Sequence, residues 1–443
     1  MVSPPENVNI VLSLLKNAGY RALLVGGCVR DILRGKTPHD WDITTSATPE
    51  EMLEVFADLR LAPVSSGGMK HGTVTVILDH EPIEVTTFRL DGEYSDGRRP
   101  DSVGFSRKLE DDLSRRDFTI NALCIDEQGE IVDMFGGRDD LKNGVIKAIG
   151  DPDKRFCEDA LRIIRALRFA ASFGFDIEKN TAESMLRNYK RLDLVASERI
   201  SDELIKLICA PDCLRVMTEY KTLICEIIPE LKPMVGMFQR SDYHCYDVFD
   251  HTIHALAAAP NEPVLRLAML LHDVGKPACA DGQGHFHRHE SVGAQLAKEI
   301  LKRFNCKKQT RDRIVSLIFR HSLPVYTDKI KIKKQLAKYG DSFLLQLLQV
   351  KRADTMAQNP AIAAERLKFL DEVQAAVQKE IESRPAVSLS QLAVKGGDII
   401  SLGVEPGPEV GKLLSELLSL VIEEKLPNER EKLLEYTIKK LNR

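Results

Sequence analysis

Two aspartates stand one residue apart in the segment "GGCVRDILRGKTPHDWDITT", residues 26–45. "WDITT" has the composition of a strand, and residues i and i+2 of a strand point to the same side, so Asp40 and Asp42 present their carboxylates together. Mg²⁺ prefers carboxylates combined with phosphate oxygens and water. Gly26 and Gly27, which precede a short helix, let backbone approach a bulky anion. The segment therefore predicts a site that holds a metal-bound triphosphate for in-line displacement by a hydroxyl.

Such a site would be completed by a third carboxylate on a neighbouring strand. Glu84 stands between Ile83 and Val85 in a stretch that alternates like a strand. The same pieces have an ordinary interpretation, in which Gly-Gly is a turn, Asp-Trp-Asp is an exposed strand end and alternation places Glu84 by chance. The arrangement of all three along the chain favours the catalytic interpretation.

The elements that must position these residues form a mixed head. Residues 6–18 predict an amphipathic helix, "RALLVGG" a strand that runs into a glycine turn, and "VRDILRG" a short helix. "GTVTVIL" and "EPIEVTTFR" predict paired strands, and "ALCID" and "IVDMF" add more. From Asp153 onward, strand patterns almost vanish; "RFCEDALRIIRALRFAASFG" and "ASERISDELIKLIC" predict strong helices. We therefore expect an α/β (α+β) head followed by a long helical body.

Composition fits a folded protein of several domains. The chain has 443 residues, 43% of them hydrophobic and 29% charged, and a formal net charge of −4, which alone makes no case for nucleic acid. Basic clusters such as "KRFNCKKQTRDR" and "KIKIKK" are more often solvent-exposed surfaces than nucleic-acid-binding surfaces. The N-terminus has no signal-peptide pattern, apolar runs are short, and nine cysteines occur without Cys-x-x-Cys. We expect a cytoplasmic protein with no membrane partner.

The order of these motifs resembles the DNA polymerase β nucleotidyltransferase superfamily. Five motifs sharpen the resemblance to the class II tRNA nucleotidyltransferase and bacterial poly(A) polymerase family: the segment that begins at residue 26, "RRDFTINAL" (115–123), "DMFGGRDDL" (133–141), "EDALRIIRALRFA" (158–170) and "ERISDEL" (198–204). The resemblance implies a polymerase-β-like head, Mg²⁺ dependence and an RNA 3′ end as acceptor. The expected domains are a head at 1–150, a nucleotide-selecting neck at 151–215, a helical body at 216–365 and a tail at 366–443.

Base selection is expected at "EDALR". The segment predicts a helix on which Asp159 and Arg162 are i and i+3, so their side chains are expected to be neighbours. Asp accepts from an exocyclic amine and Arg donates to ring acceptors, a pattern that suits cytosine and adenine but not guanine or uracil. A surface ion pair is the commoner meaning of Asp-x-x-Arg; the surrounding motif favours nucleotide selection.

Motif matching implies further roles. Gly26, Gly27 and Arg30 would hold phosphates, Arg116 would contact the nucleotide, and Asp117 and Asn121 are candidates for ribose contact. Arg165 and Arg168 extend the set; because a three-residue spacing drifts around a helix, Arg168 is expected to meet phosphate or a neighbouring helix rather than the base.

Three activities remain open on the sequence. The resemblance favours template-independent addition and repair of the 3′-terminal CCA of tRNA from CTP and ATP. A poly(A) polymerase of the same family would add only A. "FRLDGEYSDGRRPDSVGF" (88–105) resembles the flexible loop of full CCA-adding relatives and argues against addition of C alone. The third possibility is a phosphohydrolase with a degenerate head.

That third possibility comes from a second cluster, in "FDHTIHAL", "MLLHDVGKP", "HFHRHESVG", "FRHS" and "KRADTMAQN". It resembles the HD phosphohydrolase superfamily. The resemblance implies the ligands His251, His272, Asp273 and Asp354, with His289 and His321 supporting a second ion. Mixed imidazole and carboxylate ligation suits Mn²⁺, Ni²⁺, Fe or another transition metal. The alternative is an idle scaffold for tRNA.

The expected partners are the tRNA acceptor arm and elbow, with CTP and ATP. Residues 392–441 predict a helix-turn-helix-like pair and terminal helices that either hold the tRNA elbow or cap the body. The sequence leaves a monomer and a homodimer both open.

Overall fold

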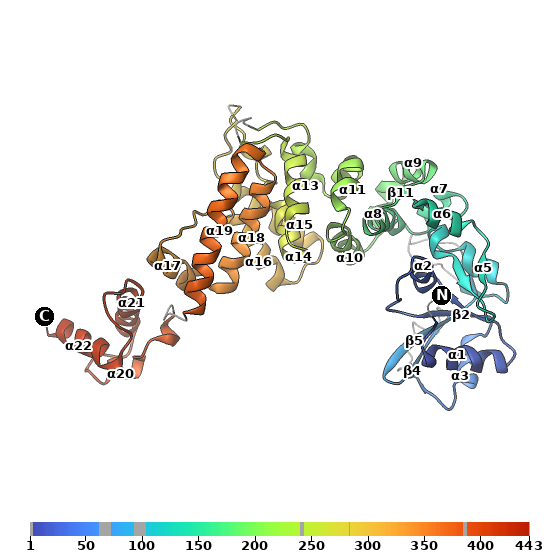
Figure 1. Cartoon of the computed structure of the whole chain (residues 1–443), viewed down its shortest axis with the longest axis horizontal. Coiled ribbons are helices and arrows are strands. Elements are labelled where there is room, and N and C mark those ends of the chain that lie inside the picture. Colours follow the sequence, from blue (N-terminus) through green and yellow to red (C-terminus); the bar gives the residue numbers. More distant parts are fainter. Residues whose placement is uncertain are drawn as a thin grey trace. The chain divides into compact units, whose positions relative to one another are not determined.

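The computed structural model describes residues 3–61, 72–92, 103–239, 243–282, 284–383 and 388–442. The chain folds into two compact units, Met1–Pro229 with Arg303–Asn305, and Glu230–Lys302 with Cys306–Arg443 (Figure 1). Each unit is described by itself.

The first unit begins with a seven-stranded sheet in the order β3-β4-β5-β2-β1-β8-β9. β2 and β5 pair in parallel, and the other neighbours in this sheet pair antiparallel. A small hairpin, β6 with β7, lies outside it. The strands are β1 (Ala22–Val25), β2 (Asp42–Thr45), β3 (Arg60–Leu61), β4 (Thr73–Leu78), β5 (Glu81–Thr87), β6 (Arg89–Asp91), β7 (Val103–Phe105), β8 (Leu123–Ile125) and β9 (Ile131–Asp133).

Alternation explains why these segments form a sheet with one apolar face. In β4 and β5, Val74, Val76, Ile83 and Val85 are buried while the residues between them are partly or fully exposed. The buried face packs with α1 and α3, and the sole tryptophan, Trp41, packs against this core. The helices of the head are α1 (Glu6–Asn17), α2 (Gly27–Leu33), α3 (Pro49–Val55), α5 (Leu109–Ser114) and α6 (Gly137–Asn143), with a 3-10 turn at Thr119–Asn121.

Helices dominate the rest of the first unit, and one prediction about them was wrong. The segment expected as a single helix over 155–174 is two helices, because α7 ends at Glu158 and α8 begins at Leu161. Asp159 has an extended backbone (φ −146°, ψ 102°). The elements are β10 (Val145–Ile146), α7 (Pro152–Glu158), α8 (Leu161–Phe173), β11 (Asp176–Ile177), α9 (Lys179–Asn188), α10 (Ser197–Ile208), α11 (Cys213–Glu219) and α12 (Lys221–Ile227), with a 3-10 segment at Tyr189–Leu194.

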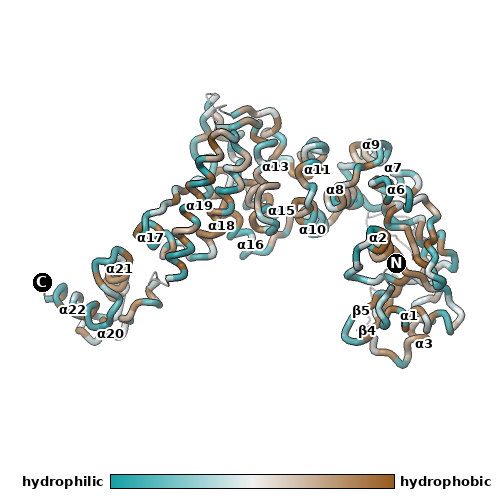
Figure 2. Tube along the Cα trace, in the orientation of Figure 1, coloured by the Kyte–Doolittle hydropathy of each residue, from teal (hydrophilic) through white to brown (hydrophobic). Residues whose placement is uncertain are grey.

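The regular elements that the structure describes in the second unit are all helices. α13, α14, α16 and α18 pack on one another, and α18 lies beside α19 (Figure 1). Hydrophobic and hydrophilic residues alternate along these helices, as amphipathic packing requires (Figure 2). The helices are α13 (Val248–Ala258), α14 (Pro263–Leu271), α15 (His289–Arg303), α16 (Lys308–Arg320), α17 (Lys329–Tyr339), α18 (Asp341–Met356), α19 (Pro360–Glu382), α20 (Gly396–Ile400), α21 (Pro408–Ile422) and α22 (Arg430–Leu441), with 3-10 turns at Pro229–Met234, Pro277–Cys279 and Leu389–Gln391.

The C-terminal helices have a core of their own. Leu392, Val394, Ile399, Leu417 and Leu433 form a buried cluster that joins α20, α21 and α22. Among the residues that the structure describes, no helix is both long enough and apolar enough to cross a membrane.

Candidate active site

Three carboxylates gather at the start of β2. Asp42 pairs with Glu84 in the parallel register of β2 and β5, and Asp40 lies two residues before Asp42. Asp42 is half-buried, whereas Asp40 and Glu84 are exposed. Burial raises the pKa of Asp42, Arg116 opposes that shift, and the carboxylates of Glu84 and Asp40 add to it. Repulsion among these groups favours a bound cation, and their oxygen-only donor set suits a hard one.

Two glycines, Gly26 and Gly27, lie against two guanidinium groups beside these carboxylates. Gly26 has φ +78°, and a Cβ there would lie 3.1 Å from Arg116 Nη1 and 3.9 Å from Asp42 Oδ2. A Cβ on Gly27 would lie 3.6 Å from Arg30 Nη2. Glycine adopts a positive φ without the strain of a side chain and leaves this space open. The arrangement has the charge and the room to accept phosphate groups.

A buried aspartate that the sequence analysis missed holds Arg116 in place. Asp112 is fully buried and accepts from Arg116 Nη2 (3.1 Å) and Arg115 Nη2 (2.6 Å). Thr44 of β2 also donates to it. The spacing of Asp112 and Arg116, four residues apart, was visible in "DDLSRRD", but burial of the carboxylate was not.

A second network runs from the glycine turn into the helices. Arg30 Nη1 donates to Asn121 Oδ1 (2.6 Å), and Asn121 Nδ2 donates to Asp117 Oδ1 (2.9 Å). Asp117 also accepts two hydrogen bonds from Arg165 (2.7 and 2.9 Å). Burial alone would raise the pKa of Asp117, but Arg165 and Asn121 hold it at about 2. Four of the residues expected at the nucleotide therefore form one connected set.

Arg168 lies on the same helix as Arg165 and turns to a neighbouring helix. Its Nε is 2.7 Å from Glu203 Oε2 of α10, and its guanidinium lies 3.9 Å from the ring centre of Phe169. The structure thus places Arg168 against protein groups rather than at the glycine turn.

The pair expected to select the base is not an i, i+3 pair within one helix. Because the chain is extended at Asp159, that carboxylate turns to Arg199 of α10, whose Nη2 donates to it at 2.8 Å. Arg162 is buried and donates to Glu158 (2.9 Å) and to the carbonyl of Arg115 (2.8 Å). Glu158 was not among the predicted site residues, although it falls inside a quoted motif. For Arg199, motif matching implies a role in bracing the base-selecting helix.

The loop expected at 88–105 lies only partly within the described residues. Its ends form the hairpin β6–β7, with Leu90 opposite Gly104. Residues 93–102 lie outside the described residues.

The second unit brings together all six residues of the second cluster, hereafter the body cluster. His251 Nε2 lies 3.0 Å from Asp354 Oδ1, and His272 Nε2 lies 3.2 Å from Asp273 Oδ2. The Nε2 atoms of His289 and His321 lie 3.3 Å apart. His289 also lies 3.6 Å from Asp273 Oδ1, which links the two halves of the cluster.

The four imidazoles share one orientation. Each Nδ1 faces a backbone carbonyl, and since a carbonyl only accepts, each Nδ1 carries the proton. Nε2 of His251, His272 and His289 therefore faces a carboxylate, and Nε2 of His321 faces His289, an arrangement typical of metal ligands. The four contacts are His251 to Ala357 (3.2 Å), His272 to Met269 (2.8 Å), His289 to Phe286 (2.8 Å) and His321 to Ile318 (2.7 Å).

Local structure explains these positions. Asp247 caps α13 by accepting from the amide of Asp250, which fixes the first turn that carries His251. His272 ends α14, and the following turn packs tightly on α15, because a Cβ on Gly275 would lie 2.3 Å from the carbonyl oxygen of His289. Only glycine permits this approach.

The electrostatics of the body cluster differ from those of the head. Burial by itself would lower the pKa of His272, but Asp273 and Asp354 raise it to about 10. Burial lowers the pKa of His321 to about 4. His272 Nε2 is buried and makes no hydrogen bond with the described residues, although two carboxylates lie nearby. A buried imidazole nitrogen that faces two carboxylates fits a metal ligand, because a cation can take the place of its proton.

Comparison with known proteins gives three matched regions. Residues 22–147 match the poly A polymerase head domain, residues 174–234 match a probable RNA and SrmB binding site of polymerase A, and residues 290–437 match a family described as tRNA nucleotidyltransferase domain 2, putative.

Whole-chain relatives agree with these regions. The chain is 36% identical to the CCA-adding enzyme of Limosilactobacillus fermentum over 97% of this chain and 95% of that protein. It is 33% identical to the CCA-adding enzyme of Lactobacillus helveticus, over 94% and 93%. The structure is similar to that of the Bacillus stearothermophilus CCA-adding enzyme in complex with CTP, with a TM-score of 0.75, 29% identity and coverage of 100% and 98%.

Proposed function

This chain belongs to the family of CCA-adding enzymes, which are nucleotidyltransferases, and we propose that it builds and repairs the 3′-terminal CCA of tRNA from CTP and ATP without a nucleic-acid template. One observation carries the assignment of the site. Asp40, Asp42 and Glu84 gather beside a glycine turn that leaves Arg30 and Arg116 open to phosphate. We call these residues, with Gly26 and Gly27, the head site.

Each group of the head site has a part in the reaction. Arg30 and Arg116 bind the triphosphate, and Gly26 and Gly27 leave room for it against the backbone. Asp112 keeps the Arg116 guanidinium in position. Glu84 adds negative charge beside Asp42 and helps hold the primer 3′-hydroxyl in line with the α-phosphate.

The residues of the head site fit a divalent cation, generally Mg²⁺ in this type of enzyme. Asp40 and Asp42 would hold it, because both offer carboxylate oxygens and Asp42 is close to the negative charges of Asp40 and Glu84. When bound, the cation supplies charge neutralisation at the phosphates and favours the ionised form of the attacking hydroxyl.

Asp117 and Asn121 would contact the ribose, and Arg165 fixes Asp117 through two hydrogen bonds. Asp159 and Arg162 would select the base. A carboxylate accepts roughly four hydrogen bonds and a guanidinium donates about five, so both retain capacity beyond their protein partners. Arg199 and Glu158 would then act as positioning residues that orient the selecting pair. Arg168 would brace α8 through Glu203.

We further propose that the tRNA acceptor arm and elbow are the nucleic-acid partners and that the protein works in the cytoplasm. The four-domain division at 1–150, 151–215, 216–365 and 366–443 remains our functional proposal, with the tail as the tRNA-binding part. It is supported by the separate core of the C-terminal helices.

The test of the proposed function is nucleotide incorporation on a tRNA transcript that ends at the discriminator base. With Mg²⁺, we expect two C's from CTP alone and one terminal A only when both nucleotides are present. Repeated A's from ATP alone would contradict CCA addition and would make the protein a poly(A) polymerase.

A second candidate function rests on the body cluster. We propose that His251, His272, Asp273, His289, His321 and Asp354 hold transition-metal ions and hydrolyse a phosphoester, as the resemblance to HD phosphohydrolases implies. The support is the common orientation of the four imidazoles, each with Nδ1 on a carbonyl. Calorimetric titration of the full chain with Mn²⁺ tests it, because tight binding should be lost in Asp273→Ala. Binding that survives this substitution would contradict the assignment.

A further inference from the structure

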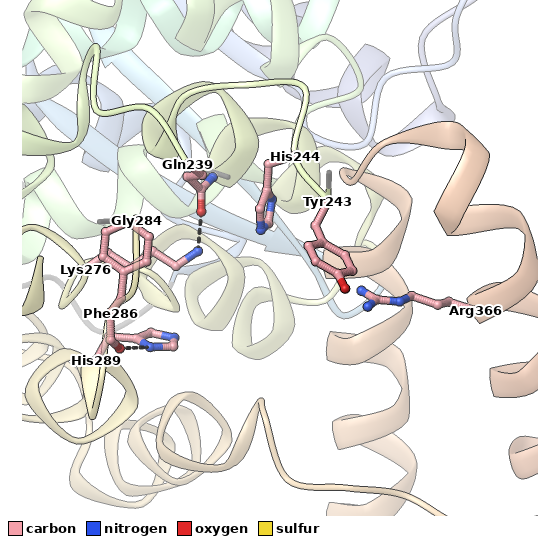
Figure 3. Close-up of a pocket in the computed structure, with 8 residues that line it drawn as sticks. All are labelled: Gln239, Tyr243, His244, Lys276, Gly284, Phe286, His289 and Arg366. Carbon is pink, nitrogen blue, oxygen red and sulfur yellow. Dashed lines mark hydrogen bonds between the residues drawn. The ribbon is translucent and has the colours of Figure 1, made fainter. Parts of the chain in front are cut away.

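Two cavities adjoin the body cluster. One, of about 310 Å³, is lined by Tyr243, Phe286, His289 and Lys276 among others (Figure 3). The other, of about 350 Å³, is lined by Phe369, Leu370, Lys351 and Asp354 among others. We call them the Tyr243 cavity and the Phe369 cavity. Each includes one residue of the body cluster, so a ligand in either would reach the same centre.

Arg366 of α19 lines both cavities. Its guanidinium lies 4.9 Å from the ring centre of Tyr243, and Figure 3 shows the two side chains directed toward each other. Arg366 is exposed and donates to Gln358 (2.6 Å), which in turn donates weakly to Asp354 (3.4 Å). A cation shared by both cavities is thus linked through Gln358 to Asp354 of the body cluster.

Each cavity also carries an exposed aromatic ring. Tyr243 is 42% exposed and Phe369 is 44% exposed. Phe369 follows Arg366 by three residues on α19, so the two lie on neighbouring positions of that helix. Exposed rings beside a cationic groove are the platforms on which nucleic-acid bases stack. Lys351 lines the Phe369 cavity, and Lys276, whose Nζ pairs with Asp273 at 2.6 Å, lines the Tyr243 cavity.

We propose that the two cavities together bind a phosphodiester that joins two nucleosides, as at the 3′ end of an RNA strand. The phosphate lies between Arg366 and the body cluster, one base stacks on Tyr243 and the other on Phe369. This proposal rests on the second candidate function and names its substrate class. A mononucleotide fills one cavity only and leaves the second ring without a base.

With such a ligand, the second candidate function is hydrolysis of the phosphodiester bond between the two nucleosides. Water attacks phosphorus, the bond from phosphorus to one ribose oxygen breaks, and the proton of the water passes to that oxygen. The products are one nucleoside with a phosphate and one with a hydroxyl, and water is the only co-reactant.

The test is equilibrium binding to the full chain in the presence of Mn²⁺. The probes are an adenylyl-adenosine dinucleotide with a phosphorothioate linkage, which resists cleavage, and AMP. We expect Phe369→Ala and Tyr243→Ala each to weaken dinucleotide binding by roughly 5- to 100-fold, the range for loss of one base–aromatic stack. AMP, which needs one ring only, should lose affinity in at most one of the two variants.

The matched control is Phe319→Ala, since Phe319 is 49% exposed on α16 and lines neither cavity. Its dinucleotide affinity should equal that of the unmodified chain. Equal affinities of the unmodified chain for the dinucleotide and AMP, or an unchanged dinucleotide affinity in Phe369→Ala, would overturn the proposal.

A Mn²⁺ titration on the same samples separates this proposal from the one on which it rests. If Mn²⁺ binds but the dinucleotide shows no dependence on the two rings, the metal centre stands and the dinucleotide site is wrong. If the ring dependence is present without Mn²⁺ binding, the dinucleotide site stands and the metal centre is wrong. If neither is seen, both are wrong.

Discussion

The head site and the body cluster both collect aspartates, yet their surroundings differ. In the head, Asp40, Asp42 and Glu84 supply only oxygen donors, and their mutual repulsion together with burial raises the pKa of Asp42. In the body, histidines face the carboxylates, and the pKa values of Asp273 and Asp354 fall well below the ordinary range despite burial. An oxygen-only site suits Mg²⁺ with phosphate, whereas a mixed nitrogen and oxygen site suits transition metals.

This difference in ligand type would allow one chain to keep two metal chemistries apart. Ligand type, rather than the number of acidic residues, distinguishes the sites. The head site also has exposed carboxylates that solvent and substrate reach, while the four imidazoles of the body cluster are locked by backbone carbonyls. Substitutions in one site should therefore leave the other intact.

The largest expected effect comes from Asp42→Ala. Loss of this carboxylate should lower incorporation of both CTP and ATP by roughly 10³-fold or more, because it would remove several kcal/mol of charge stabilisation. Binding of tRNA should stay near normal. Incorporation rates on a tRNA transcript measure the effect, with the exposed Asp58→Ala as the control. Full activity of Asp42→Ala would remove the head site from the reaction.

A smaller effect is expected for Arg162→Ala, which should blur the choice of base rather than abolish transfer. A well-placed pair of hydrogen bonds to a base contributes about 1–3 kcal/mol of discrimination, or roughly 5- to 150-fold. The ratio of correct to incorrect nucleotide incorporated at each position measures it. Unchanged selectivity would exclude Arg162 from base selection. Arg168→Ala is the matched control, since that arginine pairs with Glu203.

Asp117→Asn should destabilise the head in a pH-dependent way. The pKa of Asp117 is about 2 in the folded protein, below its unfolded value, so its contribution is full above about pH 4 and is lost as the pH falls toward 2. The expected loss near neutral pH is about 2 kcal/mol. Urea unfolding followed by fluorescence of Trp41, the sole tryptophan, reports the head unit. A difference between the two proteins that is constant from pH 6 to pH 3 would contradict this origin.

The smallest expected effect on nucleotide transfer is that of Asp273→Ala, which should leave the incorporation rate and the C, C, A order unchanged. The reason is that the body cluster lies in the other compact unit. The measurement is the same incorporation assay with Mg²⁺. A large loss of transfer in a variant whose helices remain folded would show that the two regions are coupled.

The parts of both sites that depend on local sequence pattern could be predicted from the sequence. The apolar residues on either side of Glu84 predicted a third carboxylate on a neighbouring strand, and the parallel register places it opposite Asp42. Helical spacing failed at Asp159, where the backbone is extended and the carboxylate pairs with Arg199 instead. Asp112 was missed because its role depends on burial between strand and helix. The body cluster spans more than a hundred residues, so only family resemblance, and no local spacing, could bring its ligands together.

The most direct test of the comparison is a Mn²⁺ titration of three full-length proteins: the unmodified chain, Asp42→Ala and Asp273→Ala. We expect tight Mn²⁺ binding to persist in Asp42→Ala and to disappear in Asp273→Ala. Loss of tight binding in Asp42→Ala with retention in Asp273→Ala would contradict this expectation, because the head would then be the transition-metal site.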